Sequence, residues 1–251
     1  MAQKFLVIAN CKQGGRTAFF DQLLSELASC SVFDDISLVV MPPVPYLGQL
    51  VSASPQVFQW GVQMVSGRSG TAWTGSYDAS MVAEIGAQYV CIGHSERRQH
   101  DREDSLVTIS QYQQVVEAGL TPIFCVGETA KQRAQGQSIT ILESQLSAVF
   151  NSDCFAKLPK HDIIVAYEPV WAIGADKPAD AQSVSTEFSW LTSYLTAQFS
   201  HGQYTLCYGG SVGPGNCQQF AKLPEVNGLL VGRASLDIDA IKGVLLECSG
   251  Y

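Results

Sequence analysis

Eight short apolar runs, rich in β-branched residues and each bounded by Gly, Pro, Asn or Ser, recur along this chain. They cover residues 4–10, 36–41, 57–63, 89–93, 121–126, 163–167, 204–208 and 228–232. Between them lie stretches with helical spacing of apolar residues, for example Phe19, Leu23, Leu24 and Leu27. This alternation predicts parallel strands that are connected by helical crossovers.

Strands that are apolar throughout are typical of a sheet covered on both faces. Eight βα units in 251 residues also match the size of a closed (β/α)8 barrel. An open, doubly wound sheet is the structural rival, but it usually has a Gly-x-Gly-x-x-Gly turn after its first strand, and residues 8–15 read Ile-Ala-Asn-Cys-Lys-Gln-Gly-Gly. We therefore expect an α/β protein with one domain over residues 1–251, a single (β/α)8 TIM barrel.

Composition excludes several classes of protein. The formal charge of −8 predicts repulsion of nucleic acid and of anionic membranes, so we expect neither as a partner. No apolar run approaches the roughly 18 residues that a membrane helix needs, and none near the start resembles a signal peptide. The eight cysteines form no Cys-x-x-Cys pair, which predicts reduced thiols, a cytoplasmic location and no metal site.

Polar residues at the carboxyl ends of the strands would share one rim of such a barrel. Glu168 follows an apolar run and precedes Pro169, and partial desolvation there would raise its basicity. His94 lies where a strand gives way to a helical turn, whose N–H groups disfavour the imidazolium and predict a neutral ring. The alternatives are an ordinary strand-end ion pair for Glu168 and a structural role for His94.

The same rim contains candidates for binding an anion. Lys12 follows the first strand and would hold a phosphate or neutralise an oxyanion, although a solvated loop lysine is the commoner case. Turns at Gly174, at 208–211 and at Gly232 would supply backbone N–H groups, or serve only as tight turns. The apolar segment 169–178, with Trp171, would fold over a ligand and exclude water, or pack as core.

Three longer motifs occur in order: Cys-Ile-Gly-His-Ser-Glu-Arg-Arg at 91–98, Ala-Tyr-Glu-Pro-Val-Trp-Ala-Ile-Gly at 166–174 and Tyr-Gly-Gly-Ser-Val at 208–212. With Asn10-x-Lys12 and residues 232–236, the chain resembles the triosephosphate isomerase family over nearly its whole length. The resemblance implies a cytoplasmic homodimer that interconverts dihydroxyacetone phosphate and D-glyceraldehyde 3-phosphate in glycolysis and gluconeogenesis. It implies an enediolate intermediate and no cofactor or metal.

The resemblance also implies roles for individual residues. Glu168 would move a proton between adjacent carbons, and His94 would shuttle protons between the two oxygens. Lys12 would supply positive charge to the enediolate, while Asn10 and Glu96 would order the site.

Binding of the phosphate and closure of a lid are implied in the same way. The phosphate would lie on the N–H groups of Gly174, Ser211, Gly232 and Arg233. The lid would be braced through Tyr167 and Glu128 when open and through Tyr208 and Ser211 when closed. It would comprise Pro169, Val170, Trp171, Ala172, Ile173, Gly174, Ala175, Asp176 and Lys177.

The sequence departs from the family pattern outside the acid–base pair. Cys11 replaces a tryptophan beside Lys12; Met64 and Ser76 stand where Asn and Glu are usual. The change at position 76 predicts loss of an intersubunit ion pair to Arg97, which alone should not abolish a large interface. Arg233 replaces a second glycine, and we expect its guanidinium either to face solvent or to lie at the rim and favour a more extended or more anionic substrate.

Three other functions are compatible with the pattern. The altered first motif and Arg233 suggest a paralogue that isomerises a four-carbon keto-sugar phosphate such as an erythrulose phosphate. A binding barrel without turnover is disfavoured because Lys12, His94 and Glu168 are all present. A phosphate-binding synthase would share the fold, but it does not account for the histidine motif or the lid.

Overall fold

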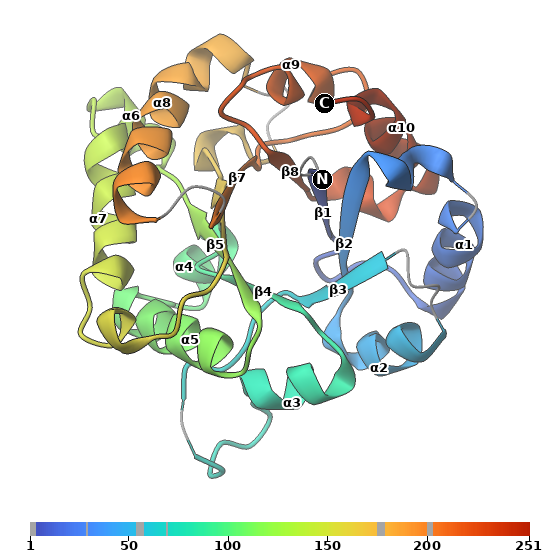
Figure 1. The fold of residues 1–251 in the computed structure, drawn as a ribbon, viewed down its shortest axis with the longest axis horizontal. Coiled ribbons are helices and arrows are strands. Elements are labelled where there is room, and N and C mark those ends of the chain that lie inside the picture. The colour runs from blue at the N-terminus through green and yellow to red at the C-terminus, as the bar shows by residue number, and fades with distance from the viewer. Residues whose placement is uncertain (1–3, 29, 54–57, 69, 175–178, 200–202) are drawn as a thin grey trace.

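Eight parallel strands form the centre of the molecule. The computed structural model describes residues 4–28, 30–53, 58–68, 70–174, 179–199 and 203–251. Each strand pairs with the next in chain order, and β1 also pairs with β8, so the sheet closes into a barrel (Figure 1). The predicted (β/α)8 barrel is confirmed. Its strands are β1 (Phe5–Asn10), β2 (Ile36–Met41), β3 (Phe58–Val62), β4 (Tyr89–Ile92), β5 (Thr121–Val126), β6 (Ile163–Tyr167), β7 (Tyr204–Tyr208) and β8 (Gly228–Val231).

The observed strands lie within a residue of the predicted ones. β3, β4 and β8 each end one residue earlier than predicted, before Gln63, Gly93 and Gly232. Gly93 has a φ of +65° and Gly232 a ψ of −93°, so neither continues an extended strand. The predicted start of the third strand, Val57, lies outside the described residues. These early ends turn the following residues toward the rim.

Helices surround the barrel (Figure 1). Four of them begin at an aspartate whose carboxylate accepts a backbone N–H of the first turn, which satisfies groups that have no partner within the helix. The α-helices are α1 (Thr17–Leu27), α2 (Val44–Ala53), α3 (Ala79–Ile85), α4 (Ser95–His100), α5 (Ser105–Glu117), α6 (Ala130–Ala134), α7 (Ser138–Phe150), α8 (Ala181–Gln198), α9 (Cys217–Ala221) and α10 (Ile238–Cys248). Short 3-10 turns are η1 (Ser31–Asp34), η2 (Phe155–Lys157), η3 (Val170–Ala172) and η4 (Arg233–Leu236).

Apolar side chains fill the inside of the barrel. They form a cluster separate from the larger core that lies between the strands and the helices. Cys91, Cys125 and Cys207 belong to this inner cluster, are fully buried and have free thiols. Burial raises the pKa of the Cys207 thiol, so the neutral form is favoured there. A packed interior leaves the two rims as the places where polar groups can gather.

One further expectation from the sequence concerns membranes. Among the described residues, no helix is both long enough and apolar enough to cross a bilayer.

Candidate active site

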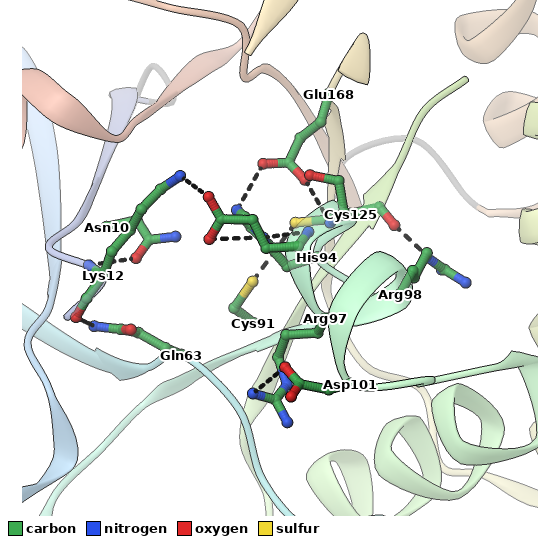
Figure 2. Close-up of polar contacts among 12 residues, drawn as sticks. Asn10, Lys12, Gln63, Cys91, His94, Arg97, Arg98, Asp101, Cys125 and Glu168 are labelled. Carbon is green, nitrogen blue, oxygen red and sulfur yellow. Dashed lines mark hydrogen bonds and ion pairs between the residues drawn. The ribbon is translucent and has the colours of Figure 1, made fainter. Parts of the chain in front are cut away.

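The three residues expected to carry chemistry meet at the carboxyl rim of the barrel (Figure 2). Glu168 follows β6, His94 follows β4 and Lys12 follows β1. Nε2 of His94 lies 3.1 Å from Oε1 of Glu168, and the Lys12 ammonium is hydrogen-bonded to the carboxylate of Glu96. All four residues line one cavity of about 720 Å³. The structure thus brings together groups from three separate segments of the chain.

Glu168 is held firmly beneath this cavity. Its N–H donates to the carbonyl of Val126 at 2.7 Å, and its Oε2 accepts the N–H of Ser95 at 3.3 Å. The side chain is only 2% exposed. Burial raises the pKa of Glu168, but His94, the Ser95 N–H and Lys12 together outweigh burial and lower it. The rise in basicity expected from desolvation is therefore reversed here, and the carboxylate is ionised.

His94 is positioned by the start of α4. The N–H of Glu96 donates to its Nδ1 at 3.2 Å, a hydrogen bond that forms only when Nδ1 carries no proton. Burial lowers the pKa of His94, whereas the charge and hydrogen bond of Glu168 raise it and have the larger combined effect. A raised pKa favours the imidazolium, but the Glu96 N–H occupies Nδ1, and on this geometry we assign a neutral ring with its proton on Nε2, facing Glu168. The carboxylate lowers the cost of adding a second proton.

Lys12 adopts an unusual backbone conformation that two amide side chains support. Its φ is +46°, in the left-handed region that costs a non-glycine residue about 1–3 kcal/mol. The Oδ1 of Asn10 accepts the Lys12 N–H at 3.0 Å, and Nε2 of Gln63 donates to the Lys12 carbonyl at 2.8 Å. Asn10 thus stabilises the turn at Lys12. The supporting role of Gln63 was missed, although its place at the end of a strand was visible in the sequence.

Two glycines make room for Glu168, and the sequence analysis predicted this role for neither. A Cβ on Gly127 would overlap the carbonyl oxygen of Glu168. A Cβ on Gly209 would lie 3.1 Å from Cγ of Glu168. Neither glycine has a positive φ, so close packing, rather than backbone conformation, requires them.

Ser211 occupies the other end of the cavity, with a left-handed φ of +49°. Its hydroxyl donates to the carbonyl of Ala172 at 2.6 Å and accepts the N–H of Gly174 at 3.0 Å. The Gly174 N–H is therefore occupied in this conformation and would have to leave Ser211 to contact an anion. Gly232 and Arg233 line the same cavity.

The described part of the predicted lid ends at Gly174; Ala175, Asp176 and Lys177 lie outside the described residues. Nε1 of Trp171 in the lid and the hydroxyl of Tyr167 at the end of β6 both donate to Glu128, at 2.8 and 3.1 Å. The brace expected for an open lid thus coexists with the Ser211 contacts expected for a closed one. Within the described part of the chain, the buried hydroxyl of Tyr208 has no hydrogen-bond partner.

Arg133 anchors the base of the lid and was not predicted. Its guanidinium contacts Glu128 at 3.1 Å and Glu187 at 2.9 Å, and it lies 4.7 Å from the ring centre of Trp171. The spacing of Glu128 and Arg133 on either side of a helix start was the only sequence signal. Glu187 joins them from α8, which no local pattern could indicate.

A second cavity, of about 660 Å³, adjoins the first. Lys12, His94 and Glu96 line both cavities, and Met64 and Arg97 line only the second. Arg97 is paired within its own chain, with Glu103 at 2.6 Å and Asp101 at 3.3 Å.

Comparisons with known proteins agree with this geometry. A family model described as triosephosphate isomerase matches residues 5–247. The triosephosphate isomerase of Xanthomonas oryzae pv. oryzae is 38% identical over 238 residues, covering 92% of both chains. That of Stenotrophomonas maltophilia is 38% identical over 235 residues, again covering 92% of both. That of Colwellia psychrerythraea is 32% identical over 257 aligned positions, covering the whole of both chains.

Proposed function

The chain belongs to the triosephosphate isomerase family, and we propose that Glu168, His94 and Lys12 carry out its reaction at the carboxyl rim of the barrel. It is an enzyme that interconverts dihydroxyacetone phosphate and D-glyceraldehyde 3-phosphate. The observation that carries the assignment of residues is the 3.1 Å contact between Nε2 of His94 and Oε1 of Glu168. A base and a proton donor are thereby held at one point of a cavity that also contains a cation.

The reaction moves one proton between adjacent carbons. The ionised carboxylate of Glu168 accepts the proton from the carbon beside the substrate carbonyl, and the electrons of that C–H bond form the carbon–carbon double bond of an enediolate. The protonated Glu168 then delivers a proton to the neighbouring carbon, which completes the isomerisation. No group is lost or gained, so the step needs no oxidant.

His94 and Lys12 stabilise the negative charge that develops on oxygen. The Nε2–H of His94 gives its proton to the carbonyl oxygen as the enediolate forms, and the ring then takes the proton of the neighbouring hydroxyl, whose oxygen becomes the new carbonyl. The ammonium of Lys12 faces the same cavity and offsets the charge, while Glu96 holds it in place.

The remaining parts bind the phosphate and exclude water. Backbone N–H groups of Gly174, Ser211, Gly232 and Arg233 are the proposed donors to the phosphate oxygens. The lid that begins at Pro169 closes over them, which keeps water from the enediolate and suppresses elimination of phosphate.

Isomerisation in deuterium oxide tests this assignment. Purified enzyme is incubated with D-glyceraldehyde 3-phosphate, and the formation of dihydroxyacetone phosphate is followed by proton NMR. We expect product that carries deuterium from solvent at the proton-accepting carbon, because the Glu168 carboxyl exchanges its proton. A preparation that forms no dihydroxyacetone phosphate would overturn the proposal. The relatives are all named triosephosphate isomerase, so nothing supports the alternative of an isomerase for a four-carbon keto-sugar phosphate, and we propose no second function.

We also propose that the enzyme is a homodimer. The segment between β3 and α3 projects from the barrel (Figure 1), and it carries Trp73, which is 44% exposed. Met81 on α3 is 52% exposed. Apolar side chains on a projecting segment are typical of an interface, and the second cavity offers a groove beside the site. Light scattering after size exclusion should give twice the chain mass, and Trp73→Glu should shift it toward the monomer; a monomeric wild type would contradict the proposal.

A role in glycolysis and gluconeogenesis in the cytoplasm, without metal or cofactor, is the remaining part of the proposal. The free thiols among the described residues are compatible with a reducing compartment. Activity should persist after dialysis against a chelator, and loss of activity that added metal restores would overturn this part.

A further inference from the structure

Arg233 lies at the rim of the active-site cavity. Its φ is not in the positive range, so the glycine usual at this position in the family is not required by the backbone. Its Nη2 lies 3.8 Å from the point where a Cβ on Gly174 would stand, and Arg233 and Gly174 line the cavity together with Lys12 and Ser211. The side chain of Arg233 is exposed to solvent and lies at the rim of the cavity.

The charged groups around Arg233 already have partners. Two of the carboxylates that line the cavity are paired with other side chains: Glu96 with Lys12, and Glu168 with His94. Asp237 caps α10 by accepting the N–H of Ala240 at 2.9 Å. Among the residues that the structure describes, Arg233 forms no hydrogen bond or ion pair, so its guanidinium is a cation without a partner at the phosphate end of the site.

The charge of the site favours a cation at this position. A phosphate monoester carries nearly two negative charges near neutral pH and must enter a cavity lined by three carboxylates, in a protein of formal charge −8. Lys12 is the other cation that lines this cavity in the described structure, and Glu96 already neutralises it. Backbone N–H groups carry only partial positive charges, whereas a guanidinium carries a full charge and makes strong, bidentate contacts to phosphate oxygens.

We propose that the Arg233 guanidinium binds the substrate phosphate directly and increases the preference of this enzyme for phosphorylated substrates. This inference rests on the proposed function, because it takes a triose phosphate as the ligand. Since Nη2 lies beside Gly174, the same group stands where the lid meets the phosphate, and its contact adds to those of the backbone donors.

The test compares Arg233→Met and Arg233→Lys with Lys160→Met. Lys160 is exposed in the segment before β6, at the opposite end of the strands, and its replacement removes the same charge. Three quantities are measured: the KM for D-glyceraldehyde 3-phosphate, the inhibition constant of inorganic phosphate, and kcat/KM for the phosphorylated substrate relative to D-glyceraldehyde, which has no phosphoryl group.

For Arg233→Met we expect the KM and the inhibition constant of phosphate to rise about tenfold, and the preference for the phosphorylated substrate to fall about tenfold. Arg233→Lys should retain part of this preference because it keeps the charge without the bidentate geometry. Lys160→Met should match the wild type. If Arg233→Met does not fold, an intermediate loss in Arg233→Lys still supports the proposal, and no loss overturns it.

Two failures are distinguishable. If the wild type isomerises the triose phosphate but Arg233→Met and Arg233→Lys bind inorganic phosphate as the wild type does, the role of Arg233 is wrong and the proposed function stands. If the wild type forms no product, the proposed function is wrong, and this inference falls with it.

Discussion

Nε2 of His94 lies 3.1 Å from Oε1 of Glu168, and both side chains are almost completely buried. The base and the proton donor are therefore in contact before substrate arrives, and each changes the pKa of the other. A substrate whose reacting atoms lie between them must replace this contact with two new ones, one to carbon and one to oxygen. The proton acceptor and the proton donor are thus already held close to the positions that the reaction requires.

Replacing Glu168 with glutamine removes the base and keeps its shape. We expect Glu168→Gln to lower kcat by about 10²- to 10⁴-fold. The inhibition constant of inorganic phosphate should change by no more than about twofold, because the base acts mainly in the transition state. Steady-state kinetics provide both values, and retained kcat would show that another group is the base.

The same variant changes the titration of His94. Without the carboxylate that raises it, the pKa of His94 should fall, since burial and the Glu96 N–H both disfavour the imidazolium. Nitrogen NMR of the labelled ring measures this directly. A pKa as high in Glu168→Gln as in the wild type would contradict the assigned contact.

The dependence of stability on pH follows from the lowered pKa of Glu168. Because its pKa is lower when folded than when unfolded, ionised Glu168 stabilises the fold above its unfolded-state pKa of about 4.3. That contribution disappears as pH falls through the folded-state pKa. In His94→Asn the carboxylate loses its main partner, burial dominates, and the pKa should rise above its usual range.

His94→Asn should therefore be less stable than the wild type at pH 7, and the difference should shrink as both carboxylates become protonated below about pH 4. Urea unfolding at several pH values measures it. The acid limb of kcat/KM should also move to higher pH in the variant. A stability difference that is independent of pH would contradict this reasoning.

Gly127 tests how closely the backbone is packed around the base. A Cβ there would overlap the Glu168 carbonyl oxygen, so Gly127→Ala should displace that strand end and destabilise the fold by about 1–3 kcal/mol. It should also lower kcat, because a small displacement of a catalytic group reduces the rate strongly. The matched control is Gly48→Ala within α2, where a Cβ would meet only Ile85 at 3.5 Å.

The control should stabilise the protein by about 0.5–1 kcal/mol, because alanine favours the helix. Chemical denaturation measures both variants. Equal stability of Gly127→Ala and the wild type would show that the chain relaxes around the added methyl group.

Tyr208 carries a buried hydroxyl without a partner in the described part of the chain. Leaving such a group unsatisfied costs about 1–3 kcal/mol, so Tyr208→Phe should be as stable as the wild type or more stable by about 1 kcal/mol. If this hydroxyl braces the closed lid, kcat/KM should fall at the same time. The control Tyr167→Phe removes a hydroxyl bonded to Glu128 at 3.1 Å and should destabilise the fold. Lower stability with unchanged kcat/KM in Tyr208→Phe would refute both parts.

Much of the fold was predictable because its signals are local. The apolar runs matched the strands to within a residue, since apolar strands and glycine-bearing ends are properties of short segments. The order of strand ends then placed Lys12, His94 and Glu168 on one rim, because parallel strands in a closed barrel all point the same way. The supporting roles of Gln63, Gly127 and Arg133 were not predictable in this way, because they depend on packing between distant segments.

By itself, the sequence determined the order of the strands, the rim that carries the site and the chemical groups available there. Only the tertiary structure decided which groups touch: Lys12 with Glu96, 84 positions apart, and the Ser95 N–H with Glu168, 73 apart. It also decided that the carboxylate of Glu168 offsets the effect of burial on the pKa of His94, and that Arg233 lies at the rim of the cavity. The physical reason is that propensity and periodicity act within a few residues, whereas contacts, burial and pKa shifts arise only when the closed barrel brings distant segments within a few ångströms.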